Sequence, residues 1–201
     1  MRRLTLAVLV VLLALLAASC GASRPIKYYA LATPSAPAIA ANPIPISLLV
    51  GRFSAPHLYR DDRIVYASGP TQRGTFEYDR WAEPPTEMVE AMLIEALRTS
   101  GQYRSVERLS SSARGEYIVK GRLDAIEEVD HPQLAARFTI ELELYQPKTG
   151  TTVWTESYTH DEPVAEKKVP AVIDALQRNV QQGLSQLVAR MGQYLASHPP
   201  Q

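Results

Sequence analysis

Residues 134–145 read LAARFTIELELY, and apolar and polar side chains alternate through almost the whole stretch. The apolar set is Leu134, Ala136, Phe138, Ile140, Leu142 and Leu144, and the polar set is Arg137, Thr139, Glu141 and Glu143. Successive side chains of a β-strand point to opposite faces, so this period of two predicts a strand with one buried and one wet face. The wet face could meet solvent or a second copy of the chain.

The neighbouring segments extend this strand into a sheet. Residues 116–128 place Tyr117, Val119 and Leu123 on one face, and residues 151–160 read as a third strand. The turn signals Asp-His-Pro at 130–132 and Pro-Lys-Thr-Gly at 147–150 separate the three. We therefore expect an antiparallel meander, with the adjacent glutamates Glu127 and Glu128 solvated near the end of its first strand.

Two segments have the period of an amphipathic helix. The first begins near Pro85, with an apolar stripe that leaves Glu90 outside it, and stops at Gly101. The second begins near Pro170 and runs to the C-terminal region. The stripes consist of Val89, Met92, Leu93, Ala96 and Leu97 in the first helix, and of Val172, Ile173, Leu176, Val180, Leu184, Leu187, Val188, Met191 and Leu195 in the second.

These patterns predict an α+β fold. Further strands are expected over residues 44–53, 63–67, 75–80 and 103–109, the middle two as a hairpin. The result is a mixed, largely antiparallel sheet of six or seven strands with two amphipathic helices packed on one face.

The N-terminus has the pattern of a secretory signal. Arg2 and Arg3 precede a run from Leu4 to Ala18 that is apolar except for Thr5. A run of this length is shorter than the roughly 20 residues that span a bilayer. The run ends in Leu-Ala-Ala-Ser-Cys at 16–20, which resembles a bacterial lipobox although leucine is commoner than Ala17 at the third position before the cysteine.

Cys20 is the only cysteine of the chain, so it has no disulfide partner, and lipidation explains its position better than an ordinary cleavage site followed by a chance cysteine. Gly21 replaces the aspartate that retains enterobacterial lipoproteins in the inner membrane, which favours the outer membrane, facing the periplasm. We expect a signal peptide at 1–19, a lipidated Pro/Ala-rich tether at 20–43, one domain at 44–197 and a tail at 198–201.

Four side chains are candidates for an interface. Tyr28, Tyr29 and Leu31 interrupt the tether, where they could form a short strand, dock a partner or cover the domain's own core. Trp81 stands between a predicted strand and the first helix, where it could staple the two together or anchor an interface.

Composition argues against several functions. The chain has 21 basic and 21 acidic residues, and loss of Arg2 and Arg3 with the signal leaves 19 against 21, which does not favour nucleic acid as a partner. The four histidines are scattered, and no metal-ligand, P-loop, dinucleotide-binding or nucleophile-elbow pattern occurs. We expect no cofactor, no metal site and no catalytic residues.

The motifs together resemble the ABC-type transport auxiliary lipoproteins, the PqiC-like family. The resemblance rests on the lipobox, on Tyr-Tyr-Ala-Leu at 28–31, on Trp-Ala-Glu-Pro at 81–84 and on Tyr117-x-Val119-x-Gly121-x-Leu123. It implies a membrane-anchored accessory subunit of a system built on MCE-domain proteins, which would be its partner, and a cargo of phospholipid or another hydrophobic molecule. Cys20 is the only residue to which the resemblance assigns a defined role.

Other functions remain open from the sequence. The domain could be a lipid-binding carrier, or an assembly lipoprotein for an outer-membrane β-barrel or for lipopolysaccharide; an enzyme is the least favoured. A docking subunit fits a lipid anchor best, because confinement to a membrane raises the local concentration of its partner.

Overall fold

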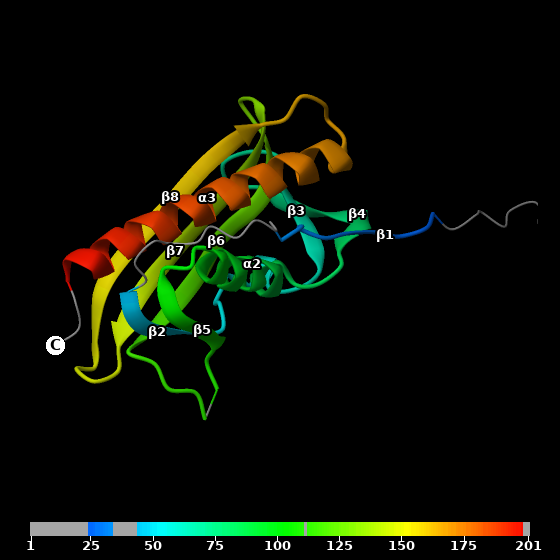
Figure 1. Ribbon diagram of the computed structural model, residues 1–201. Coiled ribbons are helices and arrows are strands. Elements are labelled where there is room, and N and C mark those ends of the chain that lie inside the picture. Colours follow the sequence, from blue (N-terminus) through cyan, green and yellow to red (C-terminus); the bar gives the residue numbers. More distant parts are fainter. Residues whose placement is uncertain (1–23, 34–43, 111, 199–201) are drawn as a thin grey trace, which may run out of the picture.

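The computed structural model describes residues 24–33, 44–110 and 112–198, so Cys20 and the signal segment lie outside the described residues. The described chain forms an α+β fold, which confirms the predicted class (Figure 1). Its strands are β1 (Lys27–Tyr29), β2 (Ile44–Val50), β3 (Arg63–Ala67), β4 (Arg73–Trp81), β5 (Tyr103–Arg108), β6 (Tyr117–Asp130), β7 (Leu134–Gln146) and β8 (Thr151–Pro163). Its helices are the 3-10 turn η1 (His57–Tyr59), α2 (Pro85–Thr99) and α3 (Val169–Ser197).

The long strand β6 organises an eight-stranded mixed sheet. One edge of β6 pairs along most of its length with β7, which pairs in turn with β8, both antiparallel. The other edge is shared: residues 117–119 pair in parallel with β2, and residues 127–129 pair in parallel with β3. β5 extends the sheet beyond β2, and β4 followed by β1 extends it beyond β3.

The predicted meander is confirmed. Along β7, residues 136–144 alternate strictly between buried and half-buried positions, with Phe138, Ile140, Leu142 and Leu144 all 0% exposed. The buried face carries α3, which lies along the three strands (Figure 1). Gly183 permits this close approach, because a Cβ there would lie 2.6 Å from the ring of Tyr158 and 3.2 Å from that of Phe138.

Both helices cover the same side of the sheet, as predicted. α2 starts with proline in its first turn, where the missing N–H leaves no helical bond unmade, and Gly101 follows it with a left-handed φ of 62°. α2 contacts β5, β6 and α3, so the two apolar stripes meet over the sheet. The largest enclosed side chains, Trp81 among them, lie in this single core.

The sheet has eight strands instead of the six or seven expected, because the segment assigned to the tether contributes β1. β1 pairs in parallel with β4, with Tyr29 opposite Trp81. The next residues attach to α3: the amide of Ala32 donates to Gln177 Oε1 at 2.6 Å, and Gln177 Nε2 donates to the carbonyl of Ala32 at 2.7 Å. The folded unit therefore includes residues N-terminal to position 44.

The expectation that Glu127 and Glu128 are solvated is wrong, since they are 0% and 5% exposed. A register shift after Leu123 and the η1 turn enclose this end of β6. Arg73 Nε and Nη2 donate to the Glu127 carboxylate at 2.9 and 3.2 Å, and the hydroxyl of Tyr59 donates to it at 2.7 Å. Burial, reinforced by that hydrogen bond, raises the pKa of Tyr59 above its ordinary value of 10.

Candidate functional site

Residues 51–56, between β2 and η1, cross the edge of β6 that pairs with β2 at one end and with β3 at the other. We call them the crossing segment, and they form one side of a pocket. Gly51 N donates to Val119 O, Ser54 N to Gly121 O and Leu123 N to Ser54 O, at 2.8–2.9 Å. The ring of Phe53 lies over Gly121, where a Cβ would come within 2.4 Å of it. The glycine of the Tyr117-x-Val119-x-Gly121-x-Leu123 motif therefore makes room for this crossing segment.

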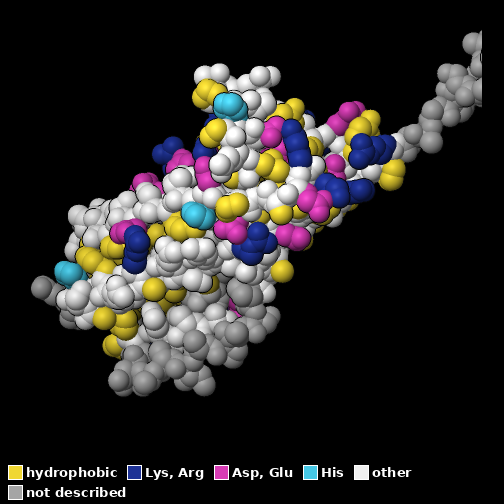
Figure 2. Space-filling view, turned by 90° about the horizontal axis from the view of Figure 1, so that it is seen from above, with side chains coloured by type: hydrophobic (Ala, Val, Ile, Leu, Met, Phe, Trp, Pro, Cys, Tyr) yellow, Lys and Arg dark blue, Asp and Glu magenta, His cyan; other side chains and the backbone are white. Residues whose placement is uncertain are grey.

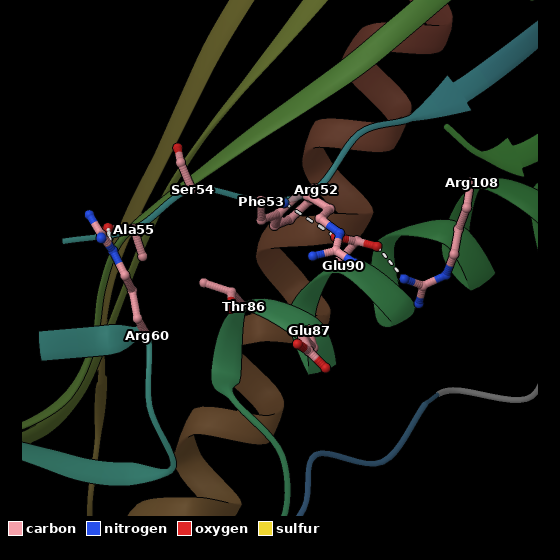
Figure 3. A pocket seen from close by; sticks show the side chains of 9 residues that line it. All are labelled: Arg52, Phe53, Ser54, Ala55, Arg60, Thr86, Glu87, Glu90 and Arg108. Atoms are coloured by element: carbon pink, nitrogen blue, oxygen red, sulfur yellow. Dashed lines mark hydrogen bonds and ion pairs between the residues drawn. The ribbon is translucent and has the colours of Figure 1, made fainter. Parts of the chain in front are cut away.

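A pocket of about 380 Å³ lies between the crossing segment and the first turns of α2 (Figure 3). Its lining consists of Arg52, Phe53, Ser54, Ala55, Arg60, Thr86, Glu87, Glu90 and Arg108. Figure 3 shows the Arg52, Glu90 and Arg108 side chains on one side of it and Arg60 on the other. Three guanidinium groups and two carboxylates thus surround a small open space.

Glu90 fixes one wall of the pocket. It was expected on the wet face of α2, but it is 4% exposed, because the crossing segment and β5 cover this side of the helix. Phe53 N donates to its Oε2 at 3.2 Å, and Arg108 Nη1 forms an ion pair with its Oε1. Arg108 balances the negative charge of the carboxylate, and the bond from Phe53 holds the helix to the crossing segment.

The other arginines keep capacity to bind. Arg60 Nε donates to the carbonyl of Ala55 at 2.7 Å, which leaves its remaining N–H groups available. Arg52 is exposed and forms no hydrogen bond or ion pair with the described residues. A guanidinium pairs well with carboxylate and phosphate, so the pocket is suited to an acidic group of a partner.

The lining of the pocket includes hydroxyl groups but no histidine. The hydroxyl groups belong to Ser54 and Thr86. His57 lies in η1, His131 in the β6–β7 turn and His160 on β8, where it approaches Glu162 at 3.5 Å. Within residues 24–33, 44–110 and 112–198, no three His, Cys, Asp or Glu side chains are grouped to hold a metal ion.

The described part of the chain also lacks a helix with the length and hydropathy needed to cross a bilayer.

The structure brings together the residues expected at an interface but does not expose them all. Tyr28 is 63% exposed on β1, whereas Tyr29 is half-buried and its hydroxyl donates to Asp79 Oδ1 at 2.9 Å. Leu31 and Trp81 are 7% and 0% exposed, so both pack in the core. Trp81 could reach a partner only if that core opened.

Sequence reasoning missed the pocket residues Arg52, Arg60 and Arg108. Arg52 follows β2, Arg60 follows η1 and Arg108 ends β5, and no local spacing joins the three. The one available signal was Glu90, a carboxylate directly beside Val89 of the helical stripe. A residue next to the stripe is buried only if another segment packs there, which the helical period cannot show.

Comparison with protein families gives one match over most of the chain. The model described as the ABC-type transport auxiliary lipoprotein component matches residues 29–189. No curated protein matches the chain.

Solved structures support the fold. A protein from Xanthomonas campestris is 22% identical, with a TM-score of 0.76 over 85% of this chain and 98% of that one. An uncharacterised protein is 14% identical, with a TM-score of 0.65 over 86% and 99%. A hypothetical protein from Chlamydia trachomatis is 7% identical, with a TM-score of 0.54 over 77% and 99%. At these identities, the likeness extends to the fold alone.

Proposed function

Because the chain belongs to the ABC-type transport auxiliary lipoprotein component family, we propose that it is a non-enzymatic docking subunit of an MCE-type transport system. The cargo would be phospholipid or another hydrophobic molecule. The observation that carries the proposal is the family match, which spans nearly every described element, from the end of β1 to well into α3. The described residues add an eight-stranded sheet and a pocket lined by charged side chains.

The proposal places the protein on the periplasmic side of the outer membrane, anchored by acyl chains on Cys20. Stable anchoring by lipid takes two hydrophobic signals, and a diacylglycerol on the thiol already supplies two chains. Replacing Cys20 by alanine should abolish acylation and release the protein from membranes. A Cys20→Ala chain that still fractionates with membranes and still supports transport would contradict the proposal.

We assign the partner contact to the pocket. Arg52 and Arg60 would receive an acidic group of the MCE-domain protein, since their guanidinium groups have donors left. The test is in-cell photocrosslinking from position 52, with position 182 as the matched control, because Gln182 is exposed on α3 away from the pocket lining. We expect an MCE-domain protein to crosslink at 52 and not at 182.

Other outcomes of this experiment would favour other functions. Capture of a β-barrel assembly protein or a lipopolysaccharide-assembly protein at position 52 would replace the docking proposal with an assembly role. A further crosslinker at Thr139, on the wet face of β7, that captures the chain itself would show a homo-oligomer, which is compatible with docking.

A lipid carrier is the second candidate, but the described pocket does not favour it. Pockets for small molecules enclose about 300–1,000 Å³ and are mostly apolar. This one, at about 380 Å³, is at the lower end of that range and is lined by five charged side chains, which would desolvate poorly against an acyl chain. If lipid copurified with the Cys20→Ala chain at near-equal stoichiometry, the lipid carrier would be favoured over the docking subunit.

A further inference from the structure

The β1 edge of the sheet exposes apolar surface in an unusual way. Among the described residues, only three large hydrophobic side chains are exposed: Ile26 at 49%, Tyr28 at 63% and Leu109 at 47%. Tyr28 lies on β1 and Ile26 directly precedes that strand, so both are at the β1 edge of the sheet. Leu109 follows β5, at the opposite end of the strand order.

Basic side chains accompany these apolar ones. The guanidinium carbon of Arg24 lies 5.2 Å from the ring centre of Tyr78, and Tyr28 is in register with Arg80 on β4. We call Arg24, Ile26, Tyr28, Tyr78 and Arg80 the β1 patch. In Figure 2, dark blue and yellow side chains lie close together at the right-hand end, which holds β1 in Figure 1, with magenta side chains between them.

Acidic side chains also lie near the patch: Glu77 is on β4, and Asp62 and Glu83 are exposed beside the C-terminal end of that strand, where Trp81 N donates to the carbonyl of Asp62. Asp79 is 8% exposed and accepts the hydrogen bond of Tyr29, so its carboxylate is directed inward. Glu77 accepts a hydrogen bond from the Tyr78 hydroxyl, which raises the pKa of Tyr78. Exposed tyrosine, an aliphatic side chain and arginine form the composition found where proteins meet the surface of an anionic bilayer.

The patch is fixed to the domain. Ala82 N donates to the carbonyl of Tyr29 at 2.7 Å, and Gln177 holds both backbone groups of Ala32. β1 is therefore part of the sheet, so the position of the β1 patch on a surface also sets the orientation of the folded domain.

Covalent geometry places this patch beside the anchor. Cys20 precedes Arg24 by four residues, and a chain extends at most about 3.6 Å per residue, so their Cα atoms are within about 14 Å. If Cys20 is acylated, as the proposed function requires, its lipid lies next to the β1 patch whatever path the intervening residues take. An exposed patch that is always near a bilayer will meet it more often than any other partner.

We propose that the β1 patch lies on the bilayer surface that holds the acyl chains of Cys20, with Tyr28 and Ile26 in the interface and Arg24 and Arg80 on anionic headgroups. The interface expected at Tyr28 is then a lipid surface. β1 and β4 face the membrane, and the opposite end of the strand order, with β5, points away from it.

The test measures the accessibility of position 28 on vesicles of phosphatidylethanolamine and phosphatidylglycerol. The full acylated chain carries either Tyr28→Cys or, as the matched control, Leu109→Cys, labelled with an environment-sensitive fluorophore. Acylated Cys20 does not react, so each variant has one free thiol. We expect acrylamide to quench the label at 28 several-fold less than the label at 109, and the emission at 28 to shift to the blue.

Flotation and the mass of the chain separate the possible failures. A chain that floats with vesicles but is quenched equally at 28 and 109 contradicts the membrane-facing patch and leaves the docking function intact. A free thiol at Cys20 and no flotation would overturn both. Strong protection of position 28 in a Cys20→Ala chain without vesicles would mean that the patch contacts another copy of the chain, which also overturns the inference.

The arginines provide a second, independent variant. Arg24→Gln leaves the acylation site and β1 pairing intact but removes a cation from the patch. We expect the protection of position 28 to fall and to depend less on phosphatidylglycerol. The role of Arg24 would be contradicted if Arg24→Gln left the protection of position 28 unchanged and if phosphatidylglycerol did not affect this protection in the parent chain.

Discussion

The β6–β7–β8 meander and the β1–β4–β3 edge belong to one sheet but are assembled in different ways. In the meander, consecutive strands pair antiparallel over about a dozen residues, and α3 covers their apolar face. At the edge, β1 joins β4, and β3 joins β6, by parallel pairings of three residues each. Polar side chains supplement these short pairings: Tyr29 with Asp79, Arg73 with Glu127, and Gln177 with Ala32.

The difference indicates where each region obtains its stability. In the meander, apolar burial is continuous, and every other residue of β7 contributes to it. At the edge, few backbone pairs form, and specific hydrogen bonds over long sequence separations fix the arrangement. Substitutions should therefore have large global effects in the meander and smaller, local or pH-dependent effects toward the edge.

The largest effect is expected for Phe138→Ala. The ring is 0% exposed beneath α3 and lies 6.0 Å from the ring of Tyr158, so the change leaves a cavity at the closest approach of helix and sheet. Burial losses of this kind cost about 3–5 kcal/mol, or roughly 6–20 °C in Tm for a domain of this size. Thermal unfolding measures it, with Thr139→Ala on the wet face as a near-neutral control.

A smaller effect is expected for Arg73→Met, where the edge meets β6. The change leaves the carboxylate of Glu127, 0% exposed, with only the Tyr59 hydroxyl as a donor. A buried acceptor that loses its charged partner costs about 1–3 kcal/mol, and access of water beside the partly exposed Arg73 keeps the loss toward the lower value. Urea unfolding measures the loss.

Arg122→Met is the control for this prediction, because its ion pair with Asp124 is exposed and should contribute less than about 1 kcal/mol. Equal losses in the two variants would mean that Glu127 is not better stabilised than a surface carboxylate.

The same two regions explain how much of the fold the sequence predicted. The period of two along residues 134–145 and the helical stripes depend on local burial, and both were confirmed. Parallel pairings such as β1 with β4 join residues about fifty positions apart, and no local pattern encodes them. The sequence therefore predicted the layers and left the strand order open.

Buried charges were the main failure. Glu127, Glu128 and Glu90 all look like surface residues, because they are acidic and lie at an element's end or beside an apolar stripe. Their burial depends on η1 and on the segment at 51–55, which come from elsewhere in the chain. The pocket could not be predicted for the same reason. The lipidation of Cys20, by contrast, was argued from local sequence alone and stays a prediction.

A third prediction concerns Glu128, at the junction of the two regions. Burial, with the nearby charge of Asp130, raises the pKa of its carboxyl group above the ordinary 4.5. The folded state then keeps a proton that the unfolded state has lost, so stability decreases as the pH rises from about 4.5 through the raised pKa. Glu128→Gln should remove this decrease.

The variant should be more stable than the parent at neutral pH, with no such advantage below about pH 4, where both states of the parent are protonated. Urea unfolding from pH 3.5 to 7.5 measures the difference, and each unit of pKa shift corresponds to about 1.4 kcal/mol. Asp161 provides a control of opposite sign. Hydrogen bonds from Arg137 lower its pKa below 3.8, so Asp161→Asn should lose stability at neutral pH and not in acid. The same pH trend in both variants would contradict the assignment.

The smallest global effect is expected for Gln177→Ala, which removes both hydrogen bonds between α3 and Ala32. Because these bonds are exposed, the loss in the free energy of unfolding should stay below about 1 kcal/mol. Local opening should still increase, since few backbone pairs hold β1 to β4. The amide of Ala82, which donates to Tyr29 O at 2.7 Å, reports on this opening, and it should exchange with solvent faster in the variant. Gln182→Ala on the exposed face of the same helix is the control. An unchanged Ala82 rate would show that the short backbone pairing is sufficient and that polar contacts do not hold the edge in place.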